Sequence, residues 1–281
     1  MARLLTPTRI FAAGEQLPVE LAEALAFAGG AVAGRMRLPG LEQWRTNVAD
    51  VVGLRMDDAH TRELARHWGR NNLWSMSLGR WDDRQVLGRV EAAPHVVEHL
   101  RTSLEGPGLI LALPHMGSWD LAGAWCARVG VQVVSVAERL PAGLYERFRD
   151  ARARMGMIIH AADERRLVDQ LAEHVEARRA VCLLSDRDLS RHGVEVRWPT
   201  GQRTTVPPGP ALLARRTGAD LRVVTSTFTR RGIALRVSDP VDASGDITAT
   251  MQAVTTHFAA DIAAHPTHWL ALQPMVRRAA P

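Results

Sequence analysis

Short apolar runs alternate with amphipathic segments from about residue 106 toward the end of the chain. Short apolar runs bounded by Gly, Pro or charged residues are typical of buried strands, whereas apolar positions three or four apart indicate helices. Strands that alternate with helices predict an α/β fold, with a central, mostly parallel sheet covered by helices on both faces. Strands are predicted at residues 106–114, 131–137, 157–160 and 180–186, helices at 118–128, 141–156, 164–179 and 207–217, an antiparallel strand pair at 221–229 and 233–239, and a last helix at about 248–264.

The first third of the chain has helical periodicity instead, at residues 41–52, 61–78 and near 95–104. An Ala- and Gly-rich apolar segment at 17–36 is interrupted by two glutamates. It predicts a helix that either packs on the domain or lies along a membrane surface. Because no linker or repeat interrupts the chain, a single domain over residues 1–281 is expected, mainly helical at 1–104 and α/β at 105–275.

Composition narrows the possible chemistry. The chain has 281 residues, of which 46% are hydrophobic and 23% charged, as in folded domains. Its net charge is +5, and all 35 cationic residues are Arg. The lack of Lys excludes a P-loop, a protein kinase and a Schiff-base enzyme. Two cysteines in apolar surroundings indicate buried thiols and a reducing compartment. No apolar run has the length of a spanning helix, and the first residues lack the pattern of a signal peptide.

His115 and Asp120 are the first candidates for chemistry. His115 follows a predicted strand in LPHMGSWDLAG, and Asp120 falls in the first turn of the next helix, for which Ser118 is the expected N-cap. A tight turn through Met116 and Gly117 would bring the carboxylate onto the imidazole. A carboxylate on one ring nitrogen fixes the tautomer, so that the other nitrogen accepts a proton from an alcohol. The alternative is a structural histidine beside a capping aspartate.

Two more acids follow predicted strands: Glu138 in VAERL and Asp186 in LLSDRD. Because active sites of parallel sheets lie beyond the carboxyl ends of the strands, His115, Glu138 and Asp186 are expected to converge on one edge. Arg152 is expected to pair with Glu138 or to bind an anionic donor, and Arg187 is a candidate substrate-binding residue. A helix-start carboxylate, a turn held by Asp and solvated arginines are the structural alternatives.

Other chemistries find little support. GxSxG is absent, and the two histidines of HPTH lack a third nearby ligand, so no metal site is predicted. The glycines of GPG precede a strand, which differs from a dinucleotide-binding fingerprint. Basic residues are not interleaved with aromatic ones, so no nucleic-acid partner is expected.

Six blocks give the chain a resemblance to a known family. The chain resembles the bacterial lipid acyltransferases that include the lauroyl and myristoyl transferases of lipid A assembly, and within them the actinobacterial phosphatidylinositol mannoside acyltransferases. The blocks occur in family order over about residues 105–275, and they are LPHMGSWDLAG, VAERL, LYERFRDARARMG, SDRDLSRHGVEV, PPGPALLARRTGA and HPTHWLALQP.

The resemblance implies an α/β acyltransferase with a long apolar groove. The enzyme would move a fatty acyl group, typically palmitoyl, from acyl-CoA as co-substrate to a mannose hydroxyl of a phosphatidylinositol mannoside. It would use no other cofactor and would lie peripherally on the cytoplasmic face of the plasma membrane. The residues that match family positions are His115 and Asp120 of the catalytic motif, Glu138, Arg152, and Asp186 as an acid that contacts the catalytic histidine.

The sequence leaves the acceptor open. An acyltransferase of the same fold that acts on another glycolipid or on a lysophospholipid fits the same residues, and so does a lipase or thioesterase that uses water. A protein that binds acyl chains without turnover is a further alternative. For the transfer reaction, His115 would be the general base, Asp120 and Asp186 would stabilise the imidazolium, and backbone N–H groups near the turn at Met116 and Gly117 would hold the oxyanion.

Overall fold

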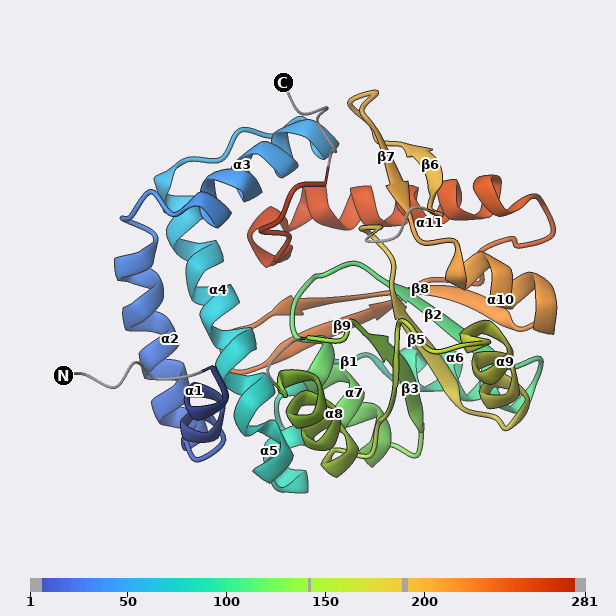
Figure 1. Cartoon of the computed structure of the whole chain (residues 1–281), viewed down its shortest axis with the longest axis horizontal. Coiled ribbons are helices and arrows are strands. Elements are labelled where there is room, and N and C mark those ends of the chain that lie inside the picture. The colour runs from blue at the N-terminus through green and yellow to red at the C-terminus, as the bar shows by residue number, and fades with distance from the viewer. Residues whose placement is uncertain (1–6, 141–142, 189–191, 276–281) are drawn as a thin grey trace.

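The computed structural model describes residues 7–140, 143–188 and 192–275. A seven-stranded sheet in the order β1-β9-β8-β2-β5-β3-β4 forms the centre of the molecule (Figure 1). All neighbouring strands are parallel except β8 and β9, which are antiparallel as predicted. The strands are β1 (Val90–Ala92), β2 (Leu109–Leu113), β3 (Val133–Ala137), β4 (Ile158–Ala161), β5 (Ala180–Leu184), β8 (Asp220–Phe228) and β9 (Ile233–Val237).

Helices cover both faces of the sheet, as the sequence pattern predicts. Over one face lie α6 (Pro94–Glu105), α7 (Trp119–Arg128) and α8 (Leu144–Arg154), and over the other lie α9 (Leu167–Glu176), α10 (Gly209–Thr217) and α11 (Ile247–Ala264). The helix predicted from residue 141 begins at Leu144, and residues 141–142 lie outside the described part of the chain. Two 3-10 turns, Leu78–Arg80 and Pro266–His268, lie after α4 and α11 respectively.

The first third is helical, as predicted. It contains α1 (Pro7–Gly14), α2 (Val19–Ala33), α3 (Pro39–Val52), α4 (Asp58–Ser77) and the short α5 (Asp83–Leu87). Figure 1 shows α2 along the outer side of α4, away from the sheet. Close packing requires Gly30, because a Cβ there would lie 2.5 Å from the backbone nitrogen of Arg66 on α4. The small residues of α2 therefore face α4, while its opposite face is exposed.

The sequence analysis missed β1, which lies in the mainly helical first third of the chain, and one further pair of strands. β6 (Val194–Arg197) and β7 (Arg203–Val206) form an antiparallel hairpin apart from the main sheet. Its turn, WPTGQ, has a glycine with φ of +87° at Gly201 and a hydrogen bond from the Trp198 indole to Thr204 (2.9 Å). The strands have only four residues each, and their alternation is too short to stand out beside the longer apolar runs.

Candidate active site

The strand order brings the three predicted strand-end residues to one edge. β5 lies between β2 and β3, and all three strands run parallel. His115 lies two residues beyond the end of β2, Asp186 two residues beyond β5, and Glu138 one residue beyond β3. The predicted convergence at the carboxyl edge of the sheet is therefore present.

His115 and Asp186 form the closest contact at this edge. The Nδ1 atom of His115 lies 2.6 Å from Oδ1 of Asp186, and the backbone N–H of His115 donates to Oδ2 at 3.0 Å. The indole of Trp269 donates to the same Oδ2 at 2.8 Å. The Asp186 side chain has no exposed surface, whereas that of His115 is 27% exposed. A buried carboxylate with three donors thus holds a histidine whose ring still reaches solvent.

These contacts lower the pKa of Asp186. Burial alone would raise the pKa of Asp186, but the charge of His115 and the hydrogen bonds from its ring, the Trp269 indole and its backbone N–H outweigh burial and lower that pKa. Asp186 is therefore ionised and accepts hydrogen bonds at both carboxylate oxygens. An imidazole that donates from Nδ1 to this carboxylate has its Nε2 free to accept a proton.

The loop that carries His115 is anchored by the segment around Trp269. Leu270 donates its N–H to the His115 carbonyl (2.7 Å), and Gly117 donates to the His268 carbonyl (2.9 Å). Gly117 has φ of +66°, and a Cβ there would lie 2.3 Å from the Ser226 carbonyl oxygen, so no other residue fits without strain. The N–H of Met116 donates to Pro114 (2.7 Å). The N–H groups of Met116 and Gly117 are thus already used, so an oxyanion near this turn would have to be held by the N–H groups that follow, at the start of α7.

Asp120 does not contact His115. Its carboxylate, buried in the first turn of α7, accepts two hydrogen bonds from Arg152 of α8, at 2.7 Å from Nε and 3.2 Å from NH2. Burial alone would lower the pKa of Arg152, but the charge and hydrogen bonds of Asp120 outweigh it and raise that pKa. The prediction that the turn folds Asp120 onto the imidazole is therefore wrong, as is the pairing of Arg152 with Glu138. Helix geometry directs Asp120 sideways to α8 instead.

The start of α7 forms the other side of the site. Trp119 packs edge-on against the His115 ring, with 5.6 Å between ring centroids. Ser118 occupies the N-cap position as predicted, but its side chain makes no capping bond, and its buried hydroxyl has no partner among the described residues. The first N–H groups of α7 have no intrahelical acceptor either. A helix N-terminus with unused donors thus faces the region around His115.

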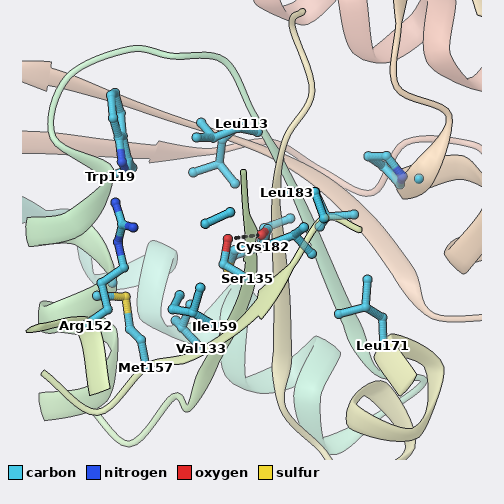
Figure 2. Close-up of a pocket in the computed structure, with 18 of the residues that line it drawn as sticks. Leu113, Trp119, Val133, Ser135, Arg152, Met157, Ile159, Leu171, Cys182 and Leu183 are labelled. Carbon is cyan, nitrogen blue, oxygen red and sulfur yellow. Dashed lines mark hydrogen bonds between the residues drawn. The ribbon is translucent and has the colours of Figure 1, made fainter. Parts of the chain in front are cut away.

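His115 lines a cavity of about 800 Å3. Figure 2 shows Leu113, Val133, Ile159 and Met157 around its interior, with Trp119 and Arg152 along one side. The few polar groups inside are satisfied locally, as in the hydrogen bond from Ser135 to the Cys182 carbonyl (2.7 Å). Burial raises the pKa of Cys126, which also lines the cavity, to about 12, so that thiol is not a nucleophile. The lining of the cavity is mainly apolar, as in sites that bind apolar ligands.

Comparison with known proteins agrees with this geometry. The family model for bacterial lipid A biosynthesis acyltransferases matches residues 9–278. The chain belongs to this family. A phosphatidylinositol mannoside acyltransferase of Mycolicibacterium smegmatis is 39% identical over 280 residues, which cover 94% of this chain and 89% of that protein. A protein of the same name from Mycobacterium tuberculosis is 38% identical over 243 residues, covering 84% of this chain and 77% of the relative.

The two remaining candidate residues of this acyltransferase, Glu138 and Arg187, also line the cavity. Glu138 is exposed and has no hydrogen bond or ion pair among the described residues, whereas Arg187 hydrogen-bonds to Gln273. Neither contacts His115, so their substrate-binding roles remain predictions.

Sequence reasoning missed Trp269 as a member of the site. Its indole is a donor to Asp186, and it lies 83 residues further along the chain. Trp269 lies in the block HPTHWLALQP, which occurs in the family order. The sequence alone does not show which residue of the site this block contacts.

Two structural findings bear on partners of this acyltransferase. Among the described residues, no helix combines the length and apolar character needed to cross a bilayer. Within the same residues, no group of three or more His, Cys, Asp or Glu side chains is arranged to hold a metal ion.

Proposed function

We propose that the protein transfers a long-chain acyl group, palmitoyl in the first instance, from acyl-CoA to a mannose hydroxyl of a phosphatidylinositol mannoside. The observation that carries the proposal is the His115–Asp186 pair at an apolar cavity of about 800 Å3. The cavity supplies a place for the acyl chain, and the exposed imidazole supplies a base for the acceptor. The printed names of both mycobacterial relatives support this choice of acceptor.

In the proposed reaction, Nε2 of His115 takes the proton of the sugar hydroxyl while the hydroxyl oxygen attacks the thioester carbonyl carbon. The tetrahedral intermediate collapses, the carbon–sulfur bond breaks, and the imidazolium returns its proton to the departing CoA thiolate. Asp186 stays ionised and stabilises the imidazolium through Nδ1. The step yields an ester and free CoA with His115 restored.

The N-terminus of α7 supports the proposal of an oxyanion site. Its unused N–H donors and positive dipole end favour the negative oxygen of the tetrahedral intermediate. Asp120 would oppose this because it places a negative charge in the first turn of the helix. Arg152 neutralises that carboxylate through two hydrogen bonds, so the pair positions the helix start without cancelling its field.

Charged groups near the cavity suit the polar parts of the substrates. Glu138 can accept hydrogen bonds from acceptor hydroxyls, and Arg187 can bind phosphate of the donor. Glu138 is the better test, because it has no partner that its substitution would disturb among the described residues. Glu138→Gln is expected to raise the KM for the acceptor with little change in the KM for acyl-CoA.

Incubation with acyl-CoA and a panel of acceptors, followed by mass spectrometry of the lipids, tests the reaction. An acylated phosphatidylinositol mannoside supports the proposal. Acylation only of another glycolipid or a lysophospholipid would indicate the same chemistry on a different acceptor. Free fatty acid without acylated lipid would indicate a hydrolase, and bound acyl chain without any turnover would indicate a binding protein.

We also propose that the protein docks peripherally on the cytoplasmic face of the plasma membrane through α2. Leu21, Leu25 and Val32 lie on one face of this helix, and their exposed fractions are 47%, 46% and 62%. Exposed Arg35 and Arg37 follow its end, where they can meet anionic head groups.

Flotation with vesicles that contain anionic lipid tests this docking. Leu25→Glu is expected to reduce the bound fraction, because it places a charge in the apolar face. Leu212→Glu, at a leucine of α10 with a similar exposed fraction of 39%, is the matched control. Equal binding of the two variants would contradict docking through α2.

A further inference from the structure

On the sheet face that α7 and α8 cover, the lining residues along β3 and leading into β4 that lie farthest from the carboxyl edge are Val133 and Met157, and this end of the cavity is called its floor. Side chains of a strand alternate between faces, so Ala137, Ser135 and Val133 of β3 lie on the same face, and all three line the cavity. Ser135 pairs with Ile159 of β4, which places Met157 level with Val133. From Ala137 at the edge to Val133 at the floor, the depth is about 13 Å at the usual rise per residue.

Met157 is the floor residue that can move. Val133 belongs to the sheet, whereas Met157 precedes β4 and has an unbranched, flexible side chain. The Met157 side chain is buried (6% exposed) against Gly123 of α7. A Cβ at Gly123 would lie 2.3 Å from the Met157 sulfur, 3.4 Å from its Cε and 3.5 Å from its Cγ. The thioether therefore occupies the space that a side chain at position 123 would need.

Local structure gives no other reason for glycine at this position. Gly123 lies inside α7, and it is not among the residues with positive φ. Glycine within a helix costs about 1 kcal/mol relative to alanine. Among the described residues, the contact with Met157 is the closest that a Cβ at position 123 would make. The absence of a side chain there lets Met157 lie outside the space that a hydrocarbon chain would fill.

We propose that Gly123 and Met157 together set the length of acyl chain that the cavity accepts, an inference that rests on the proposed acyl transfer. A methyl group at position 123 displaces the Met157 side chain into the cavity that it lines. The floor then rises, and the longest chains no longer fit. Shortening Met157 has the opposite effect and deepens the cavity.

The test compares Gly123→Ala, Met157→Ala and the double variant over a series of saturated acyl-CoA donors of increasing length. Gly123→Ala is expected to lower kcat/KM for the longest donor that the unmodified protein accepts by at least about tenfold, the usual effect of a methylene in an apolar pocket. Shorter donors should be affected little. Met157→Ala should extend the profile to longer donors, and the double variant should restore donors that Gly123→Ala rejects, because the two sites are coupled.

Gly69→Ala, inside α4, is the matched control, since the nearest atom to a Cβ at Gly69 would be the Cα of Ala26 at 3.5 Å, an ordinary van der Waals distance. Thermal unfolding of each variant checks that the fold persists. A uniform loss of activity across all donors in Gly123→Ala, or an unchanged profile in both single variants, would overturn the proposal.

The same variants also separate this inference from the transfer reaction. Dissociation constants are measured for non-hydrolysable alkyl-CoA thioethers of the same lengths. If the protein transfers no acyl group to any acceptor, a length profile in binding that shifts with Gly123→Ala still supports the floor assignment. If transfer occurs but neither binding nor turnover shifts with chain length, the floor assignment is wrong while the proposed function stands.

Discussion

Two histidine–aspartate pairs in this molecule share almost the same local geometry. In each pair, Nδ1 of the histidine lies 2.6 Å from a carboxylate oxygen, and the backbone N–H of the same histidine donates to that carboxylate. His60 and Asp57 form the first pair at the start of α4, where Asp57 is the N-cap. His115 and Asp186 form the second at the edge of the sheet.

The surroundings distinguish the pairs. The side chains of His60 and Asp57 are 43% and 69% exposed, and water competes with their contact. Asp186 is fully buried, accepts a third hydrogen bond from Trp269, and holds a histidine that faces an apolar cavity. A distance of 2.6 Å therefore does not identify a catalytic pair. Burial of the acid together with exposure of the base toward a substrate-sized cavity is what favours His115 and Asp186 as the proposed catalytic pair.

The largest difference in catalytic activity between the two pairs is expected from removing the imidazole of each. His115→Ala should lower acyl transfer by about 10³-fold, within the range that a general base contributes. His60→Ala should leave kcat/KM unchanged. Thermal unfolding of both proteins distinguishes lost chemistry from lost folding. A folded His115→Ala protein with normal turnover would contradict the proposed role of His115.

Neutralising the acids of the two pairs, Asp186 and Asp57, should give the next largest difference in kcat between the pairs. Asp186→Asn keeps the shape of the side chain but places an amide among three donors, so His115 loses its fixed tautomer. We expect a loss of about 10²-fold in kcat, with a changed pH profile of kcat/KM. Asp57→Asn should affect only helix stability, measured as the unfolding temperature. Equal kinetic effects of the two substitutions would remove the distinction between the pairs.

Asp120 extends the comparison to a buried acid that does not contact a histidine. Asp120→Asn leaves the buried charge of Arg152 without its partner, which should cost about 3 kcal/mol of unfolding free energy. Denaturant unfolding measures this cost. If Asp120 acted directly on His115, the same variant would change the pH profile of the reaction more than its stability, which is the contrary result.

The smallest effect at neutral pH is expected from His268, a histidine that accepts a hydrogen bond rather than donating one. Its Nδ1 accepts from the Phe228 N–H (2.7 Å), and burial, followed by the charges of His67 and His265, lowers its pKa from 6.5 to about 3. Between pH 6.5 and about 3, His268 is protonated in the unfolded chain but not in the folded chain. Stability should therefore fall as the pH drops through this window, by at most about 1.4 kcal/mol per pH unit for one group.

His268→Asn checks this pH dependence, because an amide oxygen can accept the same hydrogen bond without titrating. Denaturant unfolding at several pH values should show a shallower decline for the variant between pH 6.5 and 3. Asp186 acts in the same direction but in a lower pH window, since its lowered pKa stabilises the fold above about 3.8, and that contribution is lost only as the pH falls below this value. Identical slopes for the variant and the unmodified protein would show that His268 does not cause the decline.

Much of the fold could be predicted because its signals are local. The continuous apolar runs of β2, β3 and β5 mark buried parallel strands, and the periodicity of α4 and α11 marks helices. The short hairpin of β6 and β7 escaped because four residues give too little alternation. The packing of α2 on α4 was also open, since the same apolar segment fits a membrane surface or a protein face, and in the structure one face of α2 packs on α4 while the other is exposed.

The sequence by itself determined that His115, Glu138 and Asp186 follow strands and therefore share an edge. Residue spacing left open which acid holds the histidine, the family resemblance implied Asp186, and the tertiary structure decided it. Asp120 lies five residues from His115, but the start of α7 turns its carboxylate to Arg152. Asp186 lies 71 residues away, but β5 pairs directly with β2, so the two strand ends lie side by side. Strand order is set by packing of the whole sheet, and spacing along the chain does not encode it.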